Sequence, residues 1–115
     1  MYKILFEGLE KAKRQKFNGD VIDVNNIEFL NKTLDEFEFV KFSFENANFE
    51  KCNLTNIVFT GCFFYSTKFE DCTFNNVSFV SCDFDNAIFR DITDNSSSFS
   101  YCTYEGRTDF LRALH

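Results

Sequence analysis

A large apolar side chain recurs at every fifth residue from Phe29 to Tyr104, and the one exception is Asp94. Two residues before most of these centres lies a small or β-branched residue, such as Ala47 or Cys52. A helix needs apolar residues about every 3.6 positions, and an unbroken strand needs strict alternation. A period of five fits neither, so the sequence predicts very short strands, each followed by a corner, in a stacked repeat.

Turn-forming residues occupy the corner position, two residues after each centre. They include Asn31, Asn46, Asn56, Gly61, Ser66, Asp71, Asn76, Ser81, Asn86, Asp91, Ser96 and Gly106. These residue types tolerate turn dihedrals and hydrogen-bond to their own backbone. Four corners close a square coil of 20 residues, so residues 26–105 predict about four coils in one all-β domain.

The repeats resemble those of the pentapeptide-repeat family, whose motif is A(D/N)LXX. The runs that carry the resemblance are Ala47-Asn48-Phe49-Glu50-Lys51, Cys52-Asn53-Leu54-Thr55-Asn56 and Ala87-Ile88-Phe89-Arg90-Asp91. The resemblance implies a right-handed quadrilateral β-helix, a solenoid in which the centre and the small residue of each repeat both point inward. It covers residues 26–105.

Residues 20 apart should lie one above another, separated by about the strand spacing of 4.8 Å. This places four ladders of large side chains inside the coil, and three of them are aromatic throughout. The fourth, Leu34, Leu54, Phe74 and Asp94, ends on a carboxylate. An unpaired buried charge is costly, so we expect Asp94 to mark a distortion of the last coil, with ligand binding as the alternative.

The five cysteines all fall on the inward small position: Cys52, Cys62, Cys72, Cys82 and Cys102. Their odd number, the absence of a CxxC motif and a single histidine, His115, argue against a metal site or a disulfide framework. We therefore expect packed thiols in a reducing compartment, and no metal or cofactor. The first residues lack the apolar run of a signal peptide and no stretch could span a membrane, so a cytoplasmic location is expected.

The ends of a solenoid expose backbone edges and apolar rings, so both ends should carry caps. We assign residues 1–25 to an N-terminal cap and residues 106–115 to a C-terminal helix. The apolar residues of that helix are Phe110, Leu111 and Leu114. In quinolone-resistance members of the family a C-terminal helix of this sort serves dimerisation; here, covering the last coil is the alternative.

No catalytic constellation is visible in the repeats: they hold no histidine, no phosphate-binding glycine loop and no convincing pair of carboxylates. The chain is therefore predicted not to be an enzyme, and its function should lie on the outer faces of the solenoid.

One outer face combines aromatic and acidic side chains. It exposes Phe63 and Tyr65, flanked by Glu45, Asp83, Asp85 and Glu105, and the next face shows Val40, Val58 and Val80. An apolar patch rimmed by acids is typical of a protein-binding surface, and predicts a small adaptor or inhibitor, or a homodimer. The competing interpretation is that β-branched and aromatic residues simply favour strands.

Two further interpretations rest on other faces. Residues 26–105 carry thirteen acidic and five basic residues, a net charge of −8, and an acidic rod can imitate a DNA duplex. The family resemblance implies such mimicry for members that protect DNA gyrase, so DNA gyrase or topoisomerase IV are possible partners, without direct binding to nucleic acid or membrane. A flat array of Thr33, Asn53, Thr73 and Thr93 beside Thr55, Asn75 and Asn95 resembles ice-binding solenoids.

Overall fold

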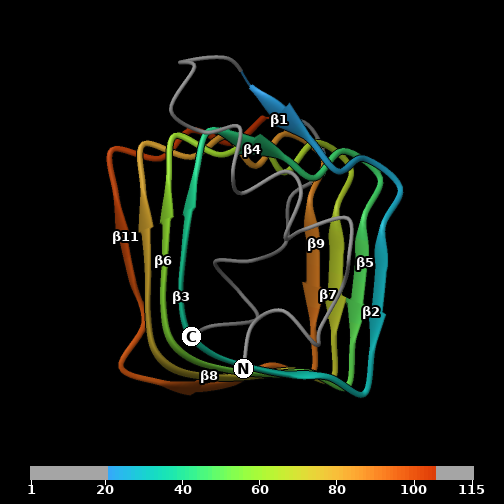
Figure 1. Ribbon diagram of the computed structural model, residues 1–115, viewed down its shortest axis with the longest axis vertical. Coiled ribbons are helices and arrows are strands. Elements are labelled where there is room, and N and C mark those ends of the chain that lie inside the picture. Colours follow the sequence, from blue (N-terminus) through green and yellow to red (C-terminus); the bar gives the residue numbers. More distant parts are fainter. Residues whose placement is uncertain (1–20, 106–115) are drawn as a thin grey trace.

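The computed structural model describes residues 21–105, and within this range every regular element is a β-strand. The strands are β1 (Ile22–Asp23), β2 (Glu28–Leu30), β3 (Thr33–Val40), β4 (Phe42–Ser43), β5 (Asn48–Glu50), β6 (Asn53–Thr60), β7 (Lys68–Glu70), β8 (Thr73–Val80), β9 (Ile88–Arg90), β10 (Thr93–Asn95) and β11 (Ser98–Ser100). Figure 1 shows them on the sides of a square coil, the outline that the period of five predicts.

Strand pairing follows one 20-residue register, and all the pairs are parallel. Phe29 pairs with Phe49 and Phe49 with Phe69, so that each residue lies above its counterpart one coil earlier. The strands form three sheets, in the orders β2-β5-β7-β9, β10-β8-β6-β3 with β11 also on β8, and β1-β4. Residues 26–105 therefore make about four coils, as predicted. The same register begins earlier, because Ile22 of β1 pairs with Phe42 of β4.

Within residues 21–105, the corner residues of the period all adopt a positive φ. It lies between 53° and 69° at fifteen non-glycine positions from Asn26 to Tyr101, and is 62° at Gly61. This left-handed region is unfavourable for most side chains. Glycine adopts it freely, and Asn and Asp adopt it at a lower cost than other residues with side chains. At one corner of the square a hydrogen bond closes the turn, from Ala87 N to Phe84 O at 2.9 Å, as in a type II turn. The prediction of a turn every five residues is confirmed.

Three strands continue across a corner instead of ending at it. β3, β6 and β8 are eight residues long and contain a positive-φ residue near the middle, at Glu36, Asn56 and Asn76. One sheet therefore bends around two sides of the square, which Figure 1 shows for β3, β6 and β8.

The interior is filled by ladders of phenylalanine. Phe59 stacks on Phe39 and Phe79, with ring centroids 5.0 and 4.9 Å apart, and meets Phe64 of the next ladder edge-on at 5.1 Å. The fully buried rings are Phe29, Phe39, Phe42, Phe44, Phe49, Phe59, Phe64, Phe69, Phe74, Phe79, Phe84 and Phe89. Such stacking within a ladder and edge contact between ladders suits the aromatic quadrupole, and together they fix the register.

The last coil departs from this regularity. The path that is one strand in β8 is divided into β10 and β11. Asp94 aligns with Phe74 but is exposed, and its Oδ1 accepts a hydrogen bond from Ser97 N at 3.1 Å. The carboxylate thus stabilises a local turn, in agreement with the predicted distortion. Tyr104, the last centre of the period, is 44% exposed.

One corner offers a test of the backbone strain. Glu36 has φ 57° and precedes Asn56 and Asn76 in its column, where Asn76 Nδ2 donates to Asn56 Oδ1 at 2.8 Å. We expect Glu36→Asn to raise the free energy of unfolding by about 0.5–1 kcal/mol, because Asn tolerates this φ and lengthens the amide ladder. Urea denaturation measures it. Glu38→Gln makes the same charge change at an exposed strand position, and an equal gain there would assign the effect to charge alone.

Candidate functional site

The outward side chains differ from one side of the square to the next. We call the side over Phe44, Phe64 and Phe84 the acidic wall. Its outward residues are Asp23, Asn25, Ser43, Glu45, Phe63, Tyr65, Asp83, Asp85, Thr103 and Glu105. Five of these ten side chains are acidic and none is basic, so the wall is a single-signed surface built on rigid backbone.

The acidic wall consists of two columns, one on each side of the inward phenylalanines. In the first, parallel bridges join Ser43 to Phe63 and Phe63 to Asp83. In the second, Tyr65 O accepts a hydrogen bond from Asn46 N at 2.9 Å, and Asp85 O accepts one from Ser66 N at 2.9 Å. Each outward side chain therefore lies about 4.8 Å from its neighbour in the next coil.

Phe63 and Tyr65 form an aromatic pair at the middle of this wall. Their ring centroids are 5.5 Å apart, with an interplanar angle of 30°, and both side chains are partly buried. They lie on either side of the buried Phe64, Phe63 at an isolated β-bridge and Tyr65 at the turn that follows, and both rings remain partly exposed on the outside of the coil. The structure thus brings together Phe63 and Tyr65 with Glu45, Asp83, Asp85 and Glu105, the group that the sequence placed on one face.

Like charges crowd this pair. Interaction with the Asp83 carboxylate is the main cause that raises the pKa of Asp85 above its ordinary value of 3.8, and Asp85 N also donates to Asp83 Oδ1 at 3.2 Å. Partial burial, followed by the Asp83, Asp85 and Glu45 carboxylates, raises the pKa of the Tyr65 hydroxyl. The contributions of neighbouring carboxylates to both shifts agree with a negative potential at this part of the wall.

The raised pKa of Asp85 has a consequence for stability. A carboxyl group whose pKa is higher in the folded state favours folding while it is protonated, and this contribution is lost as pH rises through the folded-state pKa. We therefore expect Asp85→Asn to raise the melting temperature at pH 7, where the charge repulsion acts, and to leave it unchanged well below pH 3.8, the ordinary value. Thermal melts of Asp71→Asn, the same charge change at a corner, provide the control. A gain for Asp85→Asn that is independent of pH would contradict the shift.

The valines lie on the adjoining side of the square, which is the second half of the bent sheet. Val40 and Val80 both pair with Thr60 in one column, and Val58 lies in the next column between Glu38 and Ser78. All three valines are partly buried. A corner that carries Lys41, Gly61 and Ser81 separates them from Phe63, so they flank the aromatic pair without continuing it.

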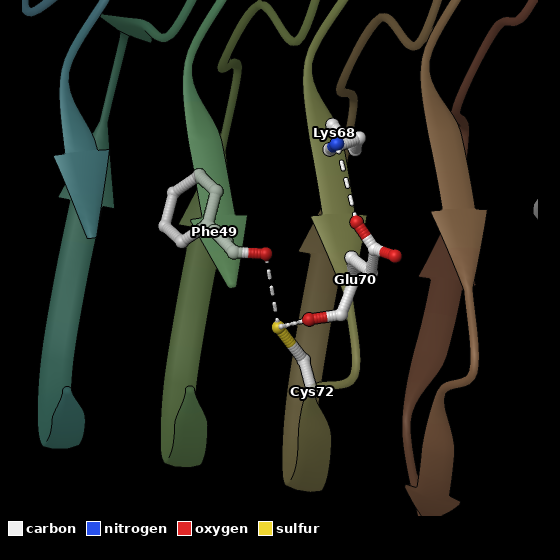
Figure 2. A network of polar contacts seen from close by, with 4 residues as sticks. All are labelled: Phe49, Lys68, Glu70 and Cys72. Atoms are coloured by element: carbon white, nitrogen blue, oxygen red, sulfur yellow. Dashed lines mark hydrogen bonds and ion pairs between the residues drawn. The ribbon is translucent and has the colours of Figure 1, made fainter. Parts of the chain in front are cut away.

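The remaining two sides are chemically distinct. The Thr/Asn array lies on the first half of the bent sheet, where each of its residues is aligned with its counterpart one coil away. Within it, Asn95 Nδ2 donates to Asn75 Oδ1 at 2.9 Å. The sheet β2-β5-β7-β9 has mixed charges, and Lys68 Nζ lies 3.1 Å from Glu70 Oε1 (Figure 2). Neither side combines an outward aromatic pair with charges of a single sign, the combination that marks the acidic wall.

The cysteine thiols are part of the core. Each donates to a main-chain carbonyl of the previous coil, as Cys72 Sγ does to Phe49 O at 3.3 Å (Figure 2). None of the five forms a disulfide. The hydrogen bond with the neighbouring Cys52 thiol, followed by burial, raises the pKa of Cys72. The Cys102 thiol favours the Cys82 thiolate, but the Cys62 thiol and burial outweigh it and raise the pKa of Cys82 to about 12. The buried thiols thus have hydrogen-bond acceptors within the core, as buried polar groups generally do.

Asp23 is a wall residue that the sequence analysis assigned to a cap. It pairs with Ser43, so it is the second acid of the first column, beside Asp83, and the fifth acid of the wall. Extending the 20-residue period backwards from Ser43 identifies this position. Phe110, Leu111 and Leu114, predicted for a cap or dimer contact, lie outside the described residues.

Residues 21–105 contain no group of three or more His, Cys, Asp or Glu side chains arranged to hold a metal ion. Within the same range no helix has the length and apolar character needed to cross a bilayer.

A family model and one solved structure agree with this architecture. The family model for pentapeptide repeats matches with eight copies, over residues 43–76 and 52–91. The solved structure of QnrB1 (trypsin-treated), a plasmid-mediated fluoroquinolone resistance protein, is similar with a TM-score of 0.57 and 22% identity, over 71% of this chain and 45% of QnrB1. A pentapeptide repeat protein, Rfr23, from the cyanobacterium Cyanothece 51142 aligns over 87% of this chain and 97% of its own, with 6% identity and a TM-score of 0.36. No curated protein matches.

At 22% identity the likeness to QnrB1 concerns the fold, and this chain spans less than half of that protein's length. The family match rests on the repeats themselves, in the same segment where the strand register and the positive-φ corners recur. The repeats of residues 43–91 and the square coil that they build show that the chain belongs to the pentapeptide-repeat family.

Proposed function

We propose that the chain is a non-enzymatic binding protein, an adaptor or inhibitor that engages another protein through the acidic wall. The observation that carries this proposal is the Phe63–Tyr65 pair, two partly exposed aromatic rings with centroids 5.5 Å apart on either side of the buried Phe64, on a wall with five acidic and no basic side chains. Aromatic side chains fixed at the centre of a polar rim are the common anchor of protein interfaces.

The test is affinity capture from cell lysate with the wild type and two variants. Phe63→Ser with Tyr65→Ser removes both rings of the wall. Leu30→Ser with Ile88→Ser removes two outward apolar side chains from the sheet β2-β5-β7-β9 and serves as the control. We expect a partner that is retained by the wild type and the control but lost by the wall variant. Equal capture by all three, with equal melting temperatures, would remove the wall from the binding site.

A second candidate is binding to a type II topoisomerase, DNA gyrase or topoisomerase IV. Two observations favour it: the fold is shared with QnrB1, a fluoroquinolone resistance protein, and residues 26–105 carry a net charge of −8. A rod with this charge offers the basic DNA-binding surface of such an enzyme a substitute for the duplex. The acids are uneven, however, because residues 46–65 carry one acid and one base, Glu50 and Lys51.

Competition for DNA separates this candidate from the adaptor. If the chain imitates DNA, it should displace a labelled duplex from purified gyrase, with an effect that weakens as salt rises. The Phe63→Ser, Tyr65→Ser variant should compete equally well, because it keeps every charge. Failure to displace the duplex at low salt would rule out DNA mimicry at this enzyme.

A further inference from the structure

We propose that the acidic wall recognises arginine, presented by a basic segment of the partner protein, and that Tyr65 and the Asp83–Asp85 pair form its receptor. This inference rests on the proposed function and specifies the chemistry of the partner.

The rings and the carboxylates have the arrangement that a guanidinium group needs. Tyr65 lies one coil before Asp85 and one coil after Glu45 in the same column, and Phe63 lies one coil before Asp83 in the other. A guanidinium lying over the Tyr65 ring would have carboxylates at its edge within about one strand spacing. A cation within about 6 Å of an aromatic centroid gains from the ring quadrupole, and carboxylates accept two parallel hydrogen bonds from arginine.

The acidic wall contains no basic side chain of its own. No Lys or Arg occupies any of its ten positions, and the partners of the Asp83–Asp85 pair within the wall carry no positive charge: Asp85 N and the Tyr65 side chain hydrogen-bond to Asp83, and the Glu105 backbone hydrogen-bonds to Asp85. The hydrogen bond with the Asp83 side chain, then partial burial and the like charge of Asp83, raise the pKa of Asp85, so the two carboxylates repel each other when both are ionised. A bound cation would relieve this repulsion, so charge complementarity selects a basic partner.

Arginine fits better than lysine for a geometric reason. The guanidinium is planar, stacks on a ring and donates along its edge at the same time, whereas an ammonium is a compact charge that is strongly hydrated. The wall offers a ring and carboxylates side by side, so the preference for arginine should depend on Tyr65, while the overall attraction should depend on the acids.

Fluorescence anisotropy with two labelled peptides, hexa-arginine and hexa-lysine, tests this on the full chain at low and moderate salt. We expect the wild type to bind hexa-arginine about two- to fivefold more tightly than hexa-lysine. Tyr65→Ser should abolish that preference. Asp83→Asn with Asp85→Asn should weaken both peptides about three- to tenfold. Asp71→Asn with Asp91→Asn removes two stacked acids from another corner and should leave the preference and the affinities nearly unchanged.

Each other outcome overturns the inference. Equal binding of the two peptides would show that the wall responds only to net charge. A preference for hexa-arginine that survives Tyr65→Ser would show that Tyr65 is not part of the receptor. Equal losses of peptide affinity in the Asp83/Asp85 and Asp71/Asp91 variants would show that binding depends on total charge and not on the position of the acids. Self-association of the purified chain that Asp83→Asn with Asp85→Asn abolishes would replace the basic partner by a second copy. If capture of a partner still depended on Phe63 and Tyr65 in these cases, the proposed function would stand without the arginine receptor.

Discussion

Replacing Phe79 with Ala is expected to lower the free energy of unfolding by about 3–5 kcal/mol, as truncation of a buried phenylalanine generally does. Phe79 is fully buried, stacks on Phe59 and Phe99 at 4.9 and 4.7 Å, and meets Phe84 edge-on at 5.3 Å. The coil cannot collapse around the cavity without breaking the 20-residue register, so little of the loss is recovered. Urea denaturation monitored by far-UV circular dichroism measures the change.

Phe63→Ala is the matched control, because it removes the same ring from an outward position. We expect a loss of about 1 kcal/mol or less there. Equal losses at Phe63 and Phe79 would contradict the division of the period into inward and outward positions.

Val77→Asp is expected to prevent folding, with a loss of at least about 4 kcal/mol. Val77 is fully buried beside Ile57 in the ladder of small inward positions. A carboxylate there would have no counter-charge, because the core is lined by rings, aliphatic side chains and thiols. The chain would either neutralise the group or lose the coil. Circular dichroism and the urea midpoint report the outcome.

Ser78→Asp places the same charge one residue further along the strand. Ser78 faces outward and is only partly buried, and its hydroxyl accepts a hydrogen bond from Ser98 Oγ at 3.3 Å, which a carboxylate can also accept. We expect a change of less than about 1 kcal/mol. Because a shift of one residue exchanges the two faces of a strand, a tolerated Val77→Asp together with a damaging Ser78→Asp would reverse the assigned register.

Much of the fold could be predicted because the same local rule is repeated along the chain. The centres such as Phe59, the small inward residues such as Cys62 and the corners such as Asn56 recur at fixed intervals, so one register satisfies all of them. The continuation of β3, β6 and β8 across a corner could not be predicted. Asn56 at that corner and Asn46 at a hydrogen-bonded one are the same residue type, so the corner residue alone does not distinguish the two cases.

The sequence predicted which residues form the candidate site, but not how their charges interact. Alternation around Phe64 places Phe63 and Tyr65 on one face, and the 20-residue period adds Asp83 and Asp85 above them. The raised pKa of Asp85 depends on how close its side chain approaches that of Asp83, which the sequence does not specify. Asp23 was missed because the first coil was begun at residue 26, although Ile22 and Val24 continue the apolar pattern.

The most direct test of the central claim is the dissociation constant of the captured partner for three forms of the chain: the wild type, Phe63→Ser with Tyr65→Ser, and the control Leu30→Ser with Ile88→Ser. If the acidic wall is the binding surface, losing its two aromatic anchors should weaken binding at least about tenfold, as expected for residues at the centre of an interface. The control should bind like the wild type. Wild-type affinity in the folded wall variant would contradict the account and place the binding surface on another side of the solenoid.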